Sequence, residues 1–234
     1  MLEEGTMIKI DYTAKVEDEN GGTVFDTTIA EIAQEQLIYN PEKEYEPMLV
    51  VIGKGWIPVG LEKALKSATA GDEFSVTVPC QDAYGLKDPS KIKLVARREF
   101  QKLSINPSIG DRITIGNQTG TVLSVSTGRV RMDYNHILAG KDIFYEIKVH
   151  EEIVGTENKI ESLLKRRLPG SDLAGLKIMI DKKLIKVYMP EKSRYYEYVQ
   201  FAKAEGAKDI MDIVPGFDGI EYIDYFDFKE MNTM

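Results

Sequence analysis

The stretch "NHILAGKDIFYEIKVHEE", residues 135–152, decides the fold. A turn is predicted at Gly140, and after it every second residue is apolar: Ile143, Tyr145, Ile147 and Val149. Such alternation is typical of a strand with one buried face. A matching strand, "MIKIDYTAKV", lies at residues 7–16. We expect these two strands to pair, although most of the first half of the chain separates them.

The residues that follow the first strand predict more of an α+β unit. Thr28 and Glu31 have the spacing of a capping box, which predicts a helix start. The other expected elements are an apolar strand at 48–53, a short helix from 59 that Gly71 ends, and an alternating strand at 73–79. These elements supply partners for the strand that returns after residue 135.

The character of the sequence changes before that return. Glycines punctuate short apolar runs in residues 90–132, and strands are predicted at 120–126 and 129–134 around a turn at Thr127 and Gly128. The pattern indicates a small β unit inserted into a host domain. We therefore predict a discontinuous host domain of residues 1–88 and 133–153, and an insert of residues 89–132.

Residues 154–234 predict a third, α+β domain. Its expected elements are a basic amphipathic helix at 158–168, a hairpin within 176–190, a helix at 191–207 and a last strand at 219–228. Its aromatic residues are numerous: Tyr188, Tyr195, Tyr196, Tyr198, Phe201, Phe217, Tyr222, Tyr225, Phe226 and Phe228. Such content suits either an interface or a self-contained core.

Composition excludes several classes of function. The formal net charge of −8 argues against a nucleic-acid partner. The first residues, "MLEEGTMIKIDY", do not resemble a signal peptide, and no apolar run is long enough for a membrane span, so we expect a cytoplasmic protein. Cys80 is the only cysteine, so no intrachain disulfide can form. His136 and His150 are the only histidines, so a His-rich metal site is excluded.

Familiar catalytic motifs are also missing. The sequence has no phosphate-binding loop and no G-x-S-x-G elbow. Its acidic runs, such as "EKEYE" at 42–46, are interpreted as solvated faces. Cys80 follows an apolar strand, which favours a partly buried thiol over a nucleophile. We therefore expect neither metal nor cofactor chemistry.

What remains is an ordered series of short aromatic and aliphatic motifs. They are "IDYTAKV" (10–16), "VFDTT" (24–28), "VIGKGWIPVGLEKAL" (51–65), "DAYG" (82–85) and "NHILAGKDIFYEIKV" (135–149). Together they resemble the FKBP-type peptidyl-prolyl cis-trans isomerases. The inserted unit is similar to the insert-in-flap domain of the SlyD-like subgroup, and the third domain resembles that of long-chain archaeal members. The fold implied is α+β: an antiparallel FKBP half-barrel sheet with a short helix, a small inserted β domain and a C-terminal α+β domain.

The resemblance also implies a site. The residues implied at the twisting bond are Tyr12, Asp26, Ile57, Tyr84 and Tyr145. The residues implied along the rest of the pocket are Phe25, Met48, Val50, Leu61 as the floor, and Ile137 or Leu138 on the flap side. From the residues alone, other interpretations stay open. Phe25, Val50 and Leu61 suit an ordinary core, Asp26 a turn or helix N-cap, and Tyr84 a turn.

Three positions depart from the family pattern. Common members have tryptophan at the position of Leu61, and SlyD-like members share the departure seen here. Tyr145 stands where phenylalanine is frequent, and its added hydroxyl needs a partner or water. Pro58 falls where the family uses a backbone N–H to hold a substrate carbonyl, and proline has none to donate. We therefore expect modest isomerase activity and weaker binding of macrolide inhibitors.

The expected function is prolyl isomerisation combined with chaperone action on unfolded or nascent chains that contain proline. The insert carries more apolar residues than so small a unit buries well, which suits binding of unfolded clients. The resemblance implies homodimerisation through the C-terminal domain. The alternative is a holdase chaperone whose FKBP scaffold has little or no isomerase activity, with Pro58 as the motivating residue. The C-terminus "FDFKEMNTM" has no histidine or cysteine for a SlyD-like metal site.

Overall fold

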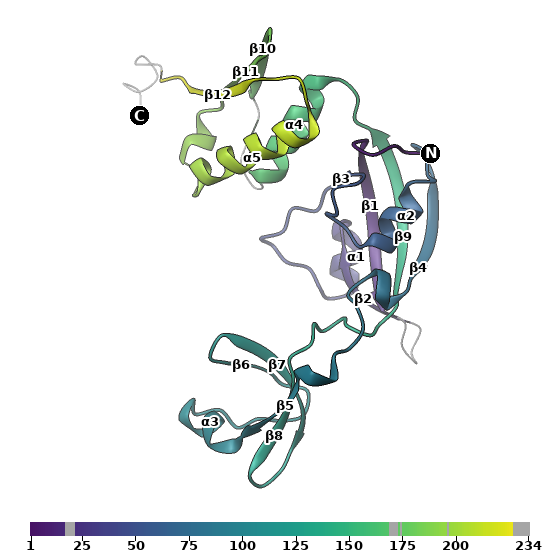
Figure 1. Cartoon of the computed structure of the whole chain (residues 1–234), viewed down its shortest axis with the longest axis vertical. Helices are drawn as coiled ribbons and strands as arrows, with labels where there is room; N and C mark the ends of the chain where they lie inside the picture. Colours follow the sequence, from purple (N-terminus) through teal and green to yellow (C-terminus); the bar gives the residue numbers. More distant parts are fainter. Residues whose placement is uncertain (17–21, 169–172, 174, 196, 227–234) are drawn as a thin grey trace.

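The computed structural model describes residues 1–16, 22–168, 173, 175–195 and 197–226. The predictions for Tyr196 and Phe228 lie outside these residues, as does the side chain of Tyr195. Three separate sheets follow one another along the long axis of the molecule (Figure 1). The central sheet lies between the inserted unit and the C-terminal unit. The predicted α+β class is confirmed.

The central sheet has the strand order β2-β1-β9-β4, and β3 pairs with β1. Its strands are β1 (Met7–Val16), β2 (Thr23–Thr27), β3 (Met48–Val51), β4 (Glu73–Val78) and β9 (Ile143–Glu152). The pairing of β1 with β9 is antiparallel and runs from Ile8 opposite Glu152 to Val16 opposite Ile143. The pairing predicted from the two alternating patterns is therefore confirmed.

Two short helices flank this sheet, α1 (Ala30–Glu35) and α2 (Val59–Leu65). Leu61 and Leu65 are buried and bring α2 onto the sheet. Gly60 permits that approach, because a Cβ there would lie 2.5 Å from Cγ1 of Val78. Both elements are shorter than predicted: the helix that starts at Val59 ends at Leu65, and the strand that starts at Met48 ends at Val51.

The predicted capping box at Thr28 is wrong. The N-cap of α1 is Ile29, and no side chain caps the helix. The Thr28 hydroxyl instead donates to Oδ1 of Asp11 at 2.7 Å and accepts from the backbone N–H of Tyr12 at 3.0 Å. Thr28 thus extends the contact between the end of β2 and β1. Its hydroxyl bonds to Asp11 and Tyr12 of β1 and does not cap the helix.

The inserted unit is a sheet of order β5-β8-β7-β6 with one helix. Its elements are β5 (Ile92–Ala96), α3 (Arg97–Lys102), β6 (Arg112–Ile115), β7 (Gln118–Val125) and β8 (Arg129–Asp133). The predicted hairpin around Gly128 is confirmed by the pairing of β7 with β8. The helix α3 was not predicted, and it places Phe100 in the small core of the insert. Short 3₁₀ helices, η1 (Cys80–Asp82) and η2 (Pro89–Lys91), precede this unit.

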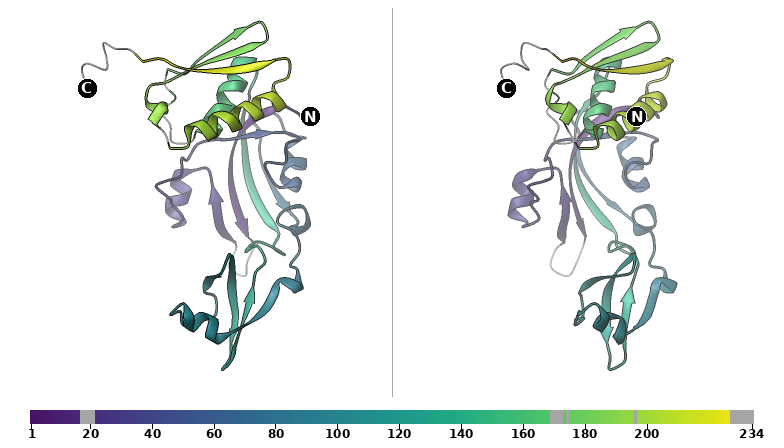
Figure 2. Two further views of the ribbon diagram at one scale, coloured as in Figure 1. Left: turned by 60° about the vertical axis from the view of Figure 1, so that its left-hand side comes forward. Right: turned by 90° about the vertical axis from the view of Figure 1, so that its left-hand side faces the viewer.

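The C-terminal unit packs two helices on one face of a three-stranded sheet (Figure 2). Its elements are α4 (Thr156–Arg167), β10 (Lys177–Asp181), β11 (Leu184–Met189), η3 (Lys192–Tyr195), α5 (Val199–Ile213) and β12 (Gly219–Asp224). The predicted hairpin is the antiparallel pair β10-β11, and β12 joins it in parallel. The helix predicted at 191–207 is misplaced: Tyr198 is left-handed, with φ of 63°, and α5 starts after it.

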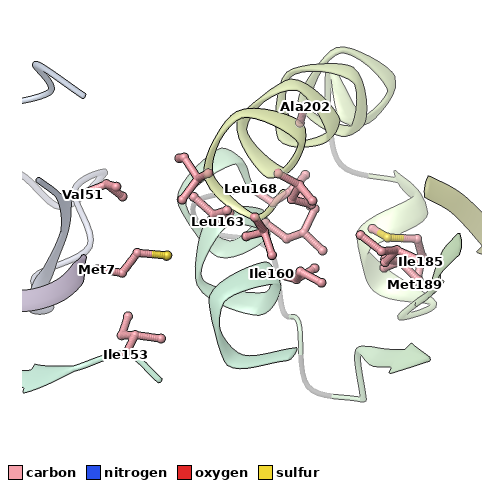
Figure 3. Close-up of a cluster of buried hydrophobic side chains, with 14 of the residues drawn as sticks. Met7, Val51, Ile153, Ile160, Leu163, Leu168, Ile185, Met189 and Ala202 are labelled. Carbon is pink, nitrogen blue, oxygen red and sulfur yellow. The ribbon is translucent and has the colours of Figure 1, made fainter. Parts of the chain in front are cut away.

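One apolar cluster joins the C-terminal unit to the central sheet. Met7, Val51 and Ile153 of the central unit pack with residues of α4 and α5 (Figure 3). Met7 and Val51 have no exposed surface. These side chains are buried in the cluster that the two units share, so their burial stabilises the arrangement of the units. Among the described residues, no helix has the length and apolar character needed to cross a membrane.

Candidate active site

Most of the site residues expected from the resemblance meet in one cluster between α2 and the central sheet. Five of its members are 9% exposed or less: Val50, Ile57, Leu61, Leu138 and Tyr145. Partly buried side chains pack against them: Tyr12 from β1, Phe25 from β2 and Met48 from β3. Because the deep members cover one another, a peptide reaches mainly the partly buried rim.

Asp26 lies at this rim, held by two neighbours. The Tyr12 hydroxyl donates to Oδ2 of Asp26 at 2.5 Å, and Nζ of Lys43 donates to Oδ1 at 2.6 Å. Lys43 also donates to the backbone carbonyl of Thr27 at 2.9 Å. Hydrogen bonds to an ionised group are short and strong, so the carboxylate has a fixed orientation. The interpretation of Asp26 as a helix N-cap is wrong, because the cap of α1 is Ile29.

Three tyrosines surround the carboxylate. The rings of Tyr12 and Tyr145 meet edge to face with centroids 6.2 Å apart. The hydroxyl of Tyr145 has Tyr84 as its partner, and burial, followed by this interaction with Tyr84, raises the pKa of Tyr145. Burial and the hydrogen bond to Asp26 likewise raise the pKa of Tyr12. Both phenols therefore stay protonated at neutral pH and act as donors.

The return segment after the insert contributes to the same rim. The His136 ring stacks on Tyr84 with centroids 4.7 Å apart and planes 2° from parallel. Nδ1 of His136 accepts from the backbone N–H of Leu138 at 3.2 Å. Of the two flap candidates, Leu138 is buried in the cluster, whereas Ile137 is 50% exposed and lies outside it.

Sequence reasoning missed two residues of the site, Lys43 and His136. Lys43 belongs to the run "EKEYE", which was interpreted as a solvated face. Its partner Asp26 is 17 positions away, and no periodic pattern links the two. His136 stands in the motif at 135–149, and its distance from Tyr84 in sequence hid the stacking. The available signal for Lys43 was that it is the single cation in an otherwise acidic run.

Pro58 lies at the start of α2, beside the apolar cluster. It directly follows the buried Ile57 and is the N-cap of α2, with φ of −53° and ψ of 140°. Its backbone carbonyl accepts from the N–H of Glu62 at 3.0 Å. Proline suits a helix start but leaves this point of the site without a backbone donor.

A cavity of about 1020 Å³ lies beside the cluster and shares only Tyr12 and Met48 with the expected site. Residues of the loop before β3, the end of β9 and α4 line most of it. Charged groups of both signs line this space together with apolar residues, and most of the expected site residues lie outside it. Among the described residues, no three histidines, cysteines or carboxylates come together to hold a metal ion.

Comparison with known proteins gives a consistent result for each unit. Residues 1–101 match the family "FKBP-type peptidyl-prolyl cis-trans isomerase", residues 93–138 match "FKBP26, IF domain", and residues 156–227 match "FKBP26_C-terminal". The short-type peptidyl-prolyl cis-trans isomerase of Methanocaldococcus jannaschii is 34% identical over 151 residues, which are 64% of this chain and 94% of that protein. The FKBP-type isomerase SlyD of Helicobacter pylori is 34% identical over 107 residues, 44% of this chain and 58% of that protein. SlyD of Treponema pallidum is 34% identical over 120 residues, 50% of this chain and 68% of that protein.

The chain therefore belongs to the FKBP-type peptidyl-prolyl cis-trans isomerases. Within that family it carries the IF and C-terminal domains of the FKBP26 type and is similar to SlyD proteins. The activity of the family is rotation about the peptide bond that precedes proline. That rotation crosses roughly 18–20 kcal/mol because the amide loses resonance as it twists, and it breaks no covalent bond. An apolar cluster with fixed donors at its rim suits this reaction.

Proposed function

We propose that the chain isomerises prolyl bonds in unfolded and partly folded proteins, and that its insert holds the client during the reaction. The observation that carries the site is the arrangement of Tyr12, Lys43 and Asp26 beside the apolar cluster. This arrangement fixes a carboxylate at the edge of an apolar surface. The proline ring enters the accessible rim, and the amide before it lies next to Asp26.

Each polar group at the rim has a proposed part in the reaction. Asp26 favours the polarisation of the amide nitrogen as its double-bond character is lost. Tyr84 donates to a substrate carbonyl, since it is 36% exposed and its hydroxyl lies beside that of Tyr145 at the rim. Ile57 and Leu61 exclude water from the twisting bond. Only interactions that strengthen as the amide twists lower the barrier.

The chaperone part of the proposal is supported by apolar side chains on the surface of the insert. Its core contains Phe100, Ile113, Val122, Val130 and Met132. Three other apolar residues remain outside: Leu94 is 61% exposed, Leu103 49% and Ile109 73%. Exposed apolar side chains on a small β unit suit weak binding of unfolded segments.

Serine substitution of these three residues tests the chaperone part. The variant Leu94→Ser, Leu103→Ser, Ile109→Ser is compared with Leu37→Ser, which removes an apolar residue 92% exposed next to α1. We expect the triple variant to lose suppression of aggregation of a thermally unfolded client, while the Leu37 variant keeps it. Equal suppression by both variants contradicts client binding by the insert.

The alternative function is a holdase with little isomerase activity, and the missing N–H of Pro58 is the observation that favours it. The two are separated with the tetrapeptide Ala-Leu-Pro-Phe in a coupled cis-trans assay. We expect acceleration over the uncatalysed reaction, because one absent hydrogen bond costs only about 0.5–1.5 kcal/mol. A rate equal to that of the uncatalysed reaction leaves the holdase as the function.

We also propose that the C-terminal unit forms a homodimer. Its aromatic residues divide into two groups: Phe217 and Tyr222 pack against its own core, whereas Tyr198 is 75% exposed and Phe201 68%. A symmetric contact through the second group would bring two client-binding inserts together and increase avidity. Light scattering after gel filtration tests this: the wild type gives a dimer, and Phe201→Ser shifts it toward the monomer. A monomeric wild type at tens of micromolar contradicts the proposal.

A further inference from the structure

The loop that leads to Ile57 is held by the C-terminal unit. The guanidinium of Arg166, on α4, lies 3.7 Å from the centre of the Trp56 ring. Nζ of Lys54 lies 2.6 Å from the carboxylate of Asp212, on α5. Both contacts cross between units that are distant in sequence, and both hold residues close to Ile57 and Pro58.

A third contact between the units reaches the other side of the site. Nζ of Lys165, the residue before Arg166, donates to the carboxylate of Glu46 at 2.6 Å. Glu46 belongs to the loop that carries Lys43, the partner of Asp26, and that continues into Met48. The same helix therefore touches both loops that border the candidate active site.

The loop before Ile57 contains two glycines, which makes its backbone costly to order. Gly53 and Gly55 both have positive φ, at 87° and 63°, which only glycine adopts without strain. Glycines lose much conformational freedom when they are ordered. The apolar cluster that includes Met7, Val51 and Ile153 fixes α4 against the end of the sheet (Figure 3). The C-terminal helices thus supply further contacts that order this loop.

We infer that Trp56 and Arg166 are positioning residues for isomerisation: α4 and α5 hold the loop of residues 53–58, and so set the position of Ile57 at the site. This inference rests on the proposed active site and adds a role for the C-terminal unit. Geometry near a reacting group is demanding, and a displacement of about 1 Å can cost as much as a hundredfold in rate. A loose loop would leave the fold intact and slow the reaction.

Substitutions at the contact test the inference in the full-length protein. We compare Arg166→Ala, Arg166→Lys and Asp212→Asn with Lys208→Ala, which removes a cation on α5 whose only ion-pair partner among the described residues is Glu205 of the same helix. The tetrapeptide assay gives kcat and KM separately. We expect Arg166→Ala to lower kcat/KM by about three- to thirtyfold, the range that a cation–π contact represents, and Arg166→Lys to recover part of the loss.

Trp56 supplies a second readout, because it is the only tryptophan in the chain. Its emission reports on the loop, and we expect Arg166→Ala to shift it and Lys208→Ala to leave it unchanged. Asp212 is 61% exposed, so Asp212→Asn tests the same loop without disturbing a core. Wild-type kcat/KM in both Arg166→Ala and Asp212→Asn overturns the inference. An inactive wild type refutes the proposed active site instead, so the two failures are distinguishable.

Discussion

Removing the hydroxyl of Tyr12 disturbs the orientation of Asp26 while leaving the aromatic packing in place. In Tyr12→Phe the ring keeps its edge-to-face contact with Tyr145, but the 2.5 Å hydrogen bond to the carboxylate is lost. Lys43 then remains as the only side chain among the described residues that holds Asp26. The substitution therefore separates carboxylate orientation from the shape of the apolar cluster.

The size of the effect follows from the environment of the bond. A hydrogen bond to a charged group contributes about 1.5–3 kcal/mol. The side chain of Asp26 is 39% exposed, so water partly replaces the lost donor and we expect about 1–2 kcal/mol. That corresponds to a fall in Tm of roughly 2–8 °C for a chain of this size. If the same orientation is needed in the transition state, kcat/KM falls by about five- to thirtyfold.

The assay compares Tyr12→Phe with Tyr39→Phe, measuring Tm and kcat/KM on the same tetrapeptide. Tyr39 is a suitable control because it is 46% exposed and stacks on Tyr45, while its hydroxyl makes no hydrogen bond to a described residue. We expect the control to keep both values. If Tyr12→Phe matches the control in both, Tyr12 does not orient Asp26 for catalysis, and the reasoning is refuted.

Three further predictions concern alkaline pH, inhibitor binding and the insert. Burial raises the pKa of five tyrosines, and it does so most strongly for Tyr12, Tyr145 and Tyr222. Above about pH 10 these three tyrosines ionise in the unfolded chain but not in the folded one. Each therefore lowers the free energy of unfolding by up to about 1.4 kcal/mol per pH unit. Midpoints of urea unfolding that stay constant between about pH 9 and 11 would contradict this. Pro58→Ile restores a backbone N–H and is expected to tighten macrolide binding by about two- to tenfold in a calorimetric titration, whereas unchanged affinity means that this position is unimportant. Gly120→Ala is expected to destabilise the insert by about 1–3 kcal/mol, because the new Cβ would lie 2.9 Å from the Tyr134 ring. Gly128→Ala, with open space around it, is the control, and equal melting of the two variants refutes the packing argument.

The central sheet was predictable because its strands alternate clearly and because one face of each is buried. Period-two patterns located β1, β4 and β9, and glycines between short apolar runs located the hairpin of the insert. Helix limits were less predictable, since they depend on competing partners. Thr28 has the sequence of a cap, but Asp11 on the neighbouring strand takes its hydroxyl. The helix α5 begins only after Tyr198, because the backbone of Tyr198 is left-handed, and the residue type does not indicate that conformation.

The apolar members of the candidate site were named from motifs, whereas its charged support was not. Lys43 lies in a run of charges that is ordinarily solvated, and only the fold brings it to Asp26. The contact between the units was hidden for the same reason. Met7 and Val51 have the pattern of a strand that packs within its own domain, yet they lie in the cluster with α4. Pairings between distant segments leave no local pattern in a single sequence.

Cooperation between the insert and the active site is tested most directly by comparing two substrates. The substrates are the tetrapeptide and a reduced, carboxymethylated protein whose slow refolding phase is a prolyl isomerisation. With the triple serine variant at Leu94, Leu103 and Ile109, we predict an unchanged rate on the tetrapeptide and at least a tenfold loss of catalysis on the protein. An equal effect on both substrates, or none on either, contradicts client holding by the insert.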